Sequence, residues 1–295
     1  MASRNFLNWA LFALLALIWG SSFILMKRSA ENLTGIQIGA VRIFAAGLAF
    51  LPFALVHVFQ VPARKLFAIF FSGLLGNLLP AFLFASAIAQ DGESSLASIL
   101  NSLTPLFVVV IGLLFFGAQV EKRKIAGVLI GLAGLVILSI SRGPLTGGSG
   151  LLLILLATIC YGITVNLVGY FLKGISPVRI ATISLTMVAI PAGLVMYHED
   201  LFSRLRHDTE AREAMAIAAL LGVAGSAIAT AIFYVLIQRA GALFASLVTY
   251  AIPIVAIFWG LLAGETIGPA QIGSLALILS GVAIANPKKR ENVDR

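Results

Sequence analysis

Long apolar runs alternate with short polar stretches along the chain of 295 residues. A helix that crosses a bilayer needs about 20 apolar residues, at about 1.5 Å of rise per residue. Ten runs qualify, although some of them are short. The pattern predicts an all-α integral membrane protein with transmembrane helices at residues 9–26, 36–58, 66–89, 96–117, 125–141, 150–172, 179–197, 214–237, 243–263 and 270–286.

Two of these runs repeat one another. Residues 97–114 read ASILNSLTPLFVVVIGLL, and residues 245–262 read ASLVTYAIPIVAIFWGLL. Six of the eighteen aligned positions are identical at a constant offset of 148, and Pro105 falls opposite Pro253. A repeat spaced by half the chain indicates an internal duplication.

A glycine-rich stretch, RGPLTGGSG at residues 142–150, lies midway along the chain and is typical of a flexible linker. Five predicted helices precede it and five follow. An odd number of helices per half makes the halves enter the membrane from opposite sides, so the repeat is inverted. We assign residues 1–143 to the first five-helix repeat, 144–149 to the linker and 150–295 to the second repeat with its basic tail.

The composition places the chain in lipid. It is 60% hydrophobic and 11% charged, whereas soluble domains are about 45–50% apolar and about 25% charged. The net charge of +8 comes from Lys and Arg at helix ends, so it does not indicate a nucleic-acid partner. With the N-terminus inside, thirteen loop Lys and Arg face the cytoplasm and six face outward, which predicts that both termini are cytoplasmic.

Charge is nearly absent from the spans. All twelve acidic residues lie in predicted loops or at helix ends, which excludes a membrane-embedded carboxylate as a coupling device. Arg42 lies well inside the second predicted helix. It could snorkel to the headgroups, bind an anionic group of a substrate, or close an outer gate. No catalytic triad, metal site, P-loop or dinucleotide fingerprint is found, so we predict no enzyme, no metal and no cofactor.

Amides in apolar helices need partners. Asn77, Asn101 and Asn166 either bond to neighbouring helices or bind a polar ligand. Asn101 favours the second alternative, because Pro105 cannot donate to its carbonyl. Pro253 frees the carbonyl of Thr249 in the same way, and Pro80 adds a kink in the third helix.

Aromatic residues form a further set of candidates. They are either interfacial anchors or walls of a cavity, and we favour the cavity for Trp19, Phe82, Tyr161, Tyr234, Tyr250 and Trp259. Ser226 joins them, because Gly73, Gly76 and Asn77 correspond to Gly222, Gly225 and Ser226 at an offset of 149. Such a cavity suits a zwitterion or a flat heterocycle better than a small ion.

The whole chain resembles the drug/metabolite transporter superfamily, in particular its EamA-type branch and its YddG-type amino-acid exporters. The resemblance rests on WGSSF at residues 19–23, the proline-containing fourth and ninth helices, and the short glycine-rich fifth and tenth helices. It implies a basket-like bundle in the bacterial inner membrane. Its central cavity would be lined by Trp19, Asn77, Phe82, Asn101, Pro105, Ser226, Tyr234, Tyr250 and Pro253.

These features predict a secondary transporter that exports small polar metabolites, amino acids first, by alternating access. Its partners would be a small-molecule substrate and the bilayer. The alternatives are an exporter of nucleosides, nucleobases or other flat heterocycles, a non-transporting scaffold, and an intramembrane enzyme. The GxxxG pairs Gly35/Gly39 and Gly127/Gly131 favour packing within a monomer, with a homodimer as the alternative.

Overall fold

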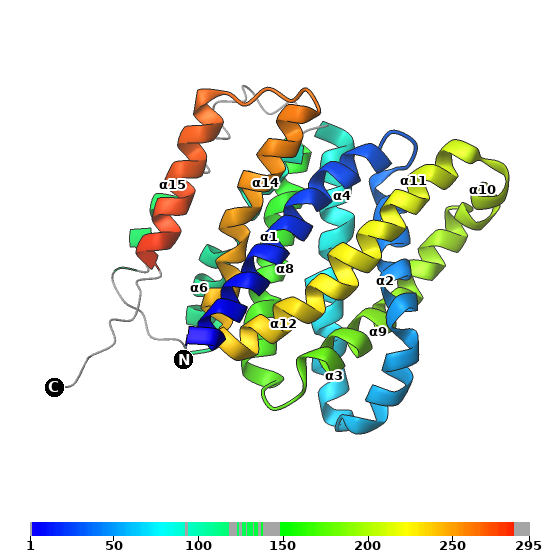
Figure 1. The fold of residues 1–295 in the computed structure, drawn as a ribbon, viewed down its shortest axis with the longest axis horizontal. Helices are drawn as coiled ribbons and strands as arrows, with labels where there is room; N and C mark the ends of the chain where they lie inside the picture. The colour runs from blue at the N-terminus through cyan, green and yellow to red at the C-terminus, as the bar shows by residue number, and fades with distance from the viewer. Residues whose placement is uncertain are drawn as a thin grey trace.

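The computed structural model describes residues 2–91, 94–117 and 148–285, with isolated positions between 118 and 147. Every regular element among the described residues is a helix, and the helices form one bundle (Figure 1). The first half contributes α1 (Ala2–Ser29), α2 (Gly35–His57), η1 (Val58–Gln60), α3 (Ala63–Gly73), η2 (Leu74–Leu78), α4 (Leu79–Asp91), α5 (Ser94–Asn101) and α6 (Thr104–Phe115). The second half contributes α8 (Gly148–Phe171), α9 (Pro177–His198), α10 (Leu201–His207), α11 (Thr209–Leu220), η3 (Leu221–Ile228), α12 (Ala229–Ala240), α13 (Ala242–Ser246), α14 (Val248–Leu262) and α15 (Pro269–Ala285).

Eight stretches of the described residues are long and apolar enough to cross a membrane, and they confirm eight of the predicted spans. Helix α15 is shorter and corresponds to the predicted tenth span. The predicted fifth span, 125–141, lies largely outside the described residues. Helix α8 begins at Gly148, inside the predicted linker.

Four spans are interrupted. The third and eighth contain the π-helical segments η2 and η3, which the apolar pattern did not predict. The fourth breaks at Ser102 and Leu103, between α5 and α6, and the ninth breaks at Leu247, between α13 and α14. Interruptions of this kind, and π-helical turns above all, gather at functional sites.

The prolines relate to these breaks in different ways. Pro105 lies in the first turn of α6, where a missing N–H costs no helical hydrogen bond. Pro80 is the second residue of α4, which follows η2. Pro253 lies inside α14, which continues through it, and the break in the ninth span lies at Leu247.

Close contacts between helices occur in matched pairs. An added Cβ on Gly222 of η3 would collide with the backbone of Arg42 in α2. An added Cβ on Gly73 of α3 would come within 2.6 Å of the carbonyl oxygen of Ser184 in α9. Gly73 and Gly222 are repeat equivalents, and an offset of 142 relates Arg42 to Ser184. A further matched pair is Gly20 on Val255 with Gly162 on Phe107. This reciprocity is what two inverted repeats packed around a common axis produce.

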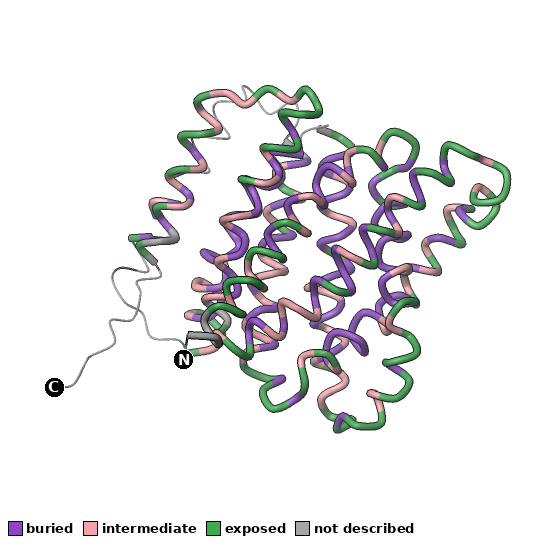
Figure 2. Tube along the Cα trace, in the orientation of Figure 1, coloured by how far each residue is buried: buried purple, intermediate pink, exposed green. Residues whose placement is uncertain are grey.

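Helices α2 and α9 form the centre of the contact between the halves. Thr186 donates to the carbonyl of Gly47 at 3.2 Å, and an added Cβ on Gly47 would collide with Ala189. Exposed residues lie along the outside of the bundle (Figure 2), and many of them are large and apolar: Phe59 is 88% exposed and Phe67 is 72% exposed. Such exposure matches a surface that faces lipid, because lipid tails are as apolar as these side chains.

Candidate substrate-binding cavity

A cavity of about 80 Å³ lies between the two halves. Ten of its twenty lining residues come from each half of the chain. Several are repeat equivalents, such as Trp19 with Tyr161 and Asn101 with Thr249. The cavity therefore lies on the axis that relates the repeats, where transporters of this architecture hold their substrates.

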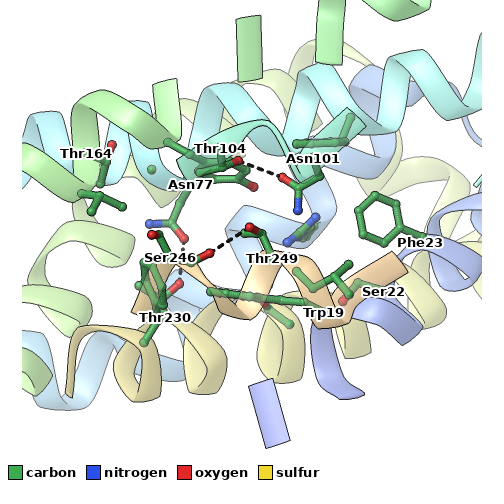
Figure 3. Close-up of a pocket in the computed structure, with 18 of the residues that line it drawn as sticks. Trp19, Ser22, Phe23, Asn77, Asn101, Thr104, Thr164, Thr230, Ser246 and Thr249 are labelled. Atoms are coloured by element: carbon green, nitrogen blue, oxygen red, sulfur yellow. Dashed lines mark hydrogen bonds between the residues drawn. The ribbon is translucent and has the colours of Figure 1, made fainter. Parts of the chain in front are cut away.

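Six of the predicted functional residues line this cavity: Trp19, Arg42, Asn77, Asn101, Tyr161 and Tyr234. The interruptions of the helices bring the two asparagines there, because Asn77 lies in η2 and Asn101 ends α5. Figure 3 shows their side chains on opposite sides of the cavity, with Trp19 along one wall.

Six other predicted residues do not line the cavity: Phe82, Pro105, Ser226, Tyr250, Pro253 and Trp259. Phe82 packs against Gly39 of α2, and Tyr250 packs against the apolar core. Both residues belong to helices that line the cavity through other residues. Successive helical residues point about 100° apart, so only one face of each helix borders the cavity. Trp259 is 38% exposed and donates from its indole N–H to the hydroxyl of Ser21 at 3.0 Å. Ser226 contributes indirectly, through Arg42.

Hydroxyl-bearing residues complete the cavity, and of these the sequence analysis singled out Thr249 alone, for its carbonyl: Ser22, Thr104, Thr164, Thr230, Ser246 and Thr249. A signal for two of them was present. Ser22 and Thr164 each follow a predicted cavity aromatic by three residues, which places them on the same helix face.

Hydrogen bonds occupy the main acceptors of the cavity (Figure 3). The hydroxyl of Thr230 donates to Oδ1 of Asn77 at 2.9 Å, and that of Thr104 donates to Oδ1 of Asn101 at 3.3 Å. The indole N–H of Trp19 donates to the carbonyl of Gly225 in η3 at 2.9 Å. These bonds join helices and fix the orientation of both amides.

The carbonyl of Thr249 is also occupied. Pro253 cannot donate to it, and the hydroxyl of Ser102 from the other half does so at 3.2 Å. At the carbonyl of Thr249, where a ligand contact was expected, a hydrogen bond from Ser102 therefore joins the two halves. Asn166 likewise serves helix packing: its Nδ2 donates to the carbonyls of Val108 and Gly162, each at 2.9 Å.

Arg42 does not snorkel to the headgroups. It is 8% exposed and lines the cavity, with Nε donating to the hydroxyl of Ser226 at 2.8 Å. Its Nη1 lies 3.7 Å from the sulfur of Met26. Among the described residues, no carboxylate forms a salt bridge with it. Of the three roles that the sequence analysis gives Arg42, two remain: binding an anionic group and closing a gate.

At one end of the bundle an ion pair joins the halves. Nζ of Lys27, in α1, lies 2.8 Å from Oε1 of Glu265, which follows α14. Ser94 donates to Oε1 through its backbone N–H and its hydroxyl, and the N–H of Ser95 donates to Oε2. Burial alone would raise the pKa of the Glu265 carboxyl, but the bonds from Lys27, Ser95 and Ser94 outweigh it and lower the pKa to about 2.

Comparison with known proteins identifies the family. The EamA-like transporter family matches the chain twice, over residues 7–140 and 148–286. The chain belongs to the EamA-like transporter family. One match falls in each half, and the family lies within the drug/metabolite transporter superfamily that the sequence resembles.

Two relatives of this EamA-like protein are named as transporters, and a third is named as a WAT1-related protein. The uncharacterized inner membrane transporter YedA of Escherichia coli is 29% identical over 93% of this chain and 89% of its own. An uncharacterized transporter of Archaeoglobus fulgidus is 23% identical over 96% of this chain and 99% of its own. The WAT1-related protein At3g02690, chloroplastic, of Arabidopsis thaliana is 24% identical over 96% of this chain and 70% of its own.

A solved crystal structure supports the fold. It aligns with a TM-score of 0.62 at 19% identity, over 96% of this chain and 97% of the other. The EamA-like protein is thus a multi-pass membrane transporter that contacts the bilayer and a small-molecule substrate. Its family and relatives point to transport and not to catalysis.

Proposed function

We propose that this protein exports small polar metabolites, amino acids first, by alternating access through the central cavity. The observation that carries the proposal is the cavity itself, which both halves line equally and which contains amides, hydroxyls and aromatic rings. A substrate held there contacts both halves, so rocking one half against the other would move its access from one face to the other.

The charge pattern supports the orientation of the chain in the membrane. Lys and Arg favour cytoplasmic termini, in the inner membrane of a bacterium. In that orientation the Lys27–Glu265 ion pair lies at the outer face, where it holds the halves together. Opening outward would then require this pair to separate, while the substrate remains near the middle of the bundle.

Flat heterocycles such as nucleosides are the second candidate, and the aromatic walls favour it. The rings of Trp19 and Phe233 lie 5.1 Å apart, and those of Phe84 and Tyr161 are stacked at 6.0 Å. Faces of this kind bind planar ligands, but they also bind the ammonium group of an amino acid.

Counterflow in proteoliposomes tests the proposal. Liposomes preloaded with one unlabelled amino acid should accumulate the same labelled amino acid faster than empty liposomes do. Asn101→Ala should lower the rate, because it removes an amide from the cavity. Trp259→Phe, outside the cavity, should leave the rate unchanged. Equal rates in wild type and Asn101→Ala would show that the substrate does not bind at this amide.

A further inference from the structure

We propose that Arg42 binds a carboxylate of the transported substrate, which makes the substrate a carboxylic acid or an amino acid. This inference rests on the central cavity being the transport site. Four observations support it: the burial of the guanidinium, the lack of an acidic partner, the donors left over in the cavity wall, and the asymmetry of the repeats.

The guanidinium is buried without compensation. Its partners within the described chain are the neutral hydroxyl of Ser226 and the sulfur of Met26, a weak acceptor. Within the part of the chain that the structure describes, no Asp or Glu lines the cavity. A buried charge is costly unless it is paired and hydrogen-bonded, and a neutral hydroxyl does not neutralise it. A bound anion would supply the missing charge.

The hydrogen bonds of the cavity leave donors over. The side-chain oxygens of Asn77 and Asn101 already accept from threonine hydroxyls. In contrast, Nδ2 of Asn77 and the hydroxyl of Tyr234 are buried and form no hydrogen bond of good geometry, although the two side chains lie within reach of each other. With the unused N–H groups of Arg42, the wall therefore offers donors to a ligand that brings acceptors. A carboxylate has two oxygens that accept only.

The repeat shows that the fold does not require the charge. Ser184 occupies the equivalent place in the second half and is fully buried. Gly222 packs on the backbone of Arg42 as Gly73 packs on that of Ser184. One architecture thus accommodates either side chain, and the guanidinium is an addition specific to the first half.

The proposal narrows the substrate class. A carboxylate at Arg42 leaves the aromatic rings of Trp19 and Phe233 for the rest of the molecule, including an ammonium group. Neutral nucleosides lack the charge that the guanidinium needs, and purely cationic compounds would be repelled by it.

Ligand pairs that differ only in charge test the site. Thermal unfolding of the purified full-length protein is measured with acetate and acetamide, benzoate and benzamide, and phenylalanine and phenylalaninamide, at constant ionic strength. We expect at least one carboxylate to stabilise the wild type saturably and its amide not to do so. Amides that stabilise as well as their carboxylates, or no stabilisation by any carboxylate, would overturn the proposal.

Variants then locate the effect. Arg42→Gln should weaken carboxylate binding at least about tenfold, the size expected for one lost charge-assisted hydrogen bond, and Arg42→Lys should retain part of it. Arg206→Gln, which removes the same charge from an exposed site on α10, should bind as wild type does. Wild-type affinity in Arg42→Gln would refute the assignment. Should that variant not fold, Arg42→Lys together with the wild-type ligand pairs decides.

Flux separates this inference from the proposed function. Counterflow of a neutral nucleoside at equal rates in wild type and Arg42→Lys, with no flux of any carboxylate, would overturn the carboxylate site but leave transport standing. Arg42-dependent carboxylate binding without flux of any ligand would overturn the proposed transport but leave the carboxylate site standing.

Discussion

The ion pair between Lys27 and Glu265 offers the sharpest test of how the two halves are held together. Lys27 belongs to the first repeat and Glu265 to the second, and the carboxylate also accepts from Ser94 and Ser95. Glu265→Gln keeps the shape of the side chain and one accepting oxygen. It removes the charge and replaces the other accepting oxygen with an amide donor, so the change in stability reports the charge together with the hydrogen bond that this oxygen accepts.

The size of the effect follows from the pKa. A fall from the ordinary value of 4.5 to about 2 marks a folded state that favours the ionised carboxyl. At about 1.4 kcal/mol per pH unit, the difference corresponds to about 3 kcal/mol. Because the side chain of Lys27 is 29% exposed, solvent screens the pair. We therefore expect Glu265→Gln to lower the free energy of unfolding by about 1–2 kcal/mol at neutral pH.

The pH dependence has a defined sign. The pKa of Glu265 is lower in the folded state than in the unfolded state, so its stabilisation is complete above pH 4.5 and is lost as the pH falls toward 2. The difference in Tm between wild type and Glu265→Gln should therefore shrink from pH 5 to about pH 3.

The assay is thermal unfolding of the detergent-purified protein, followed by tryptophan fluorescence across this pH range. Glu213→Gln is the matched control, because that glutamate is exposed on α11. Its Tm should follow that of wild type at every pH. A constant difference between wild type and Glu265→Gln down to pH 3, or no difference at pH 7, would refute the electrostatic account of this contact.

Two further predictions concern packing between the halves. Gly222→Ala should lower the free energy of unfolding by about 1–3 kcal/mol, because its Cβ would meet the α2 backbone. The control Gly273→Ala, in open space on α15, should be neutral or stabilise by up to about 1 kcal/mol. Equal effects of the two changes in thermal unfolding would contradict the close approach. Ser102→Ala should cost about 1–3 kcal/mol, because it leaves the buried carbonyl of Thr249 without its donor. The same change should cost less in a Pro253→Ala background, where a backbone N–H returns, and strict additivity in the double-mutant cycle would contradict this role.

The spans could be read from the sequence because their length, not their amphipathic pattern, identifies them. Residues facing lipid and residues facing the core are both apolar, as exposed Phe67 and buried Ile69 on α3 illustrate. For the same reason the sequence could not show which face of a helix lines the cavity. Phe84 lines it and Phe82 does not, although both are aromatic residues of α4.

The site was predictable where polar residues stand out in apolar helices. Asn77 and Asn101, which the sequence analysis expects in the cavity, line it, and so does Arg42, which it expects to snorkel, bind an anion or close a gate. Their partners were not predictable, because Ser226 bonds to Arg42 across 184 positions of the chain and Thr230 bonds to Asn77 across 153. The π-helical segments η2 and η3 also left no pattern in composition, since each reads as an ordinary run of small and apolar residues.

Counterflow with the purified wild-type protein tests the central claim most directly, that the cavity between the repeats carries a small polar substrate across the membrane. Liposomes would be preloaded in turn with a panel of amino acids and nucleosides, and uptake of the labelled compound would be compared with that of protein-free liposomes. We predict uptake of at least one amino acid, reduced by Asn101→Ala. Absence of flux for every amino acid and nucleoside of the panel, in vesicles that hold folded protein, would contradict the proposed function.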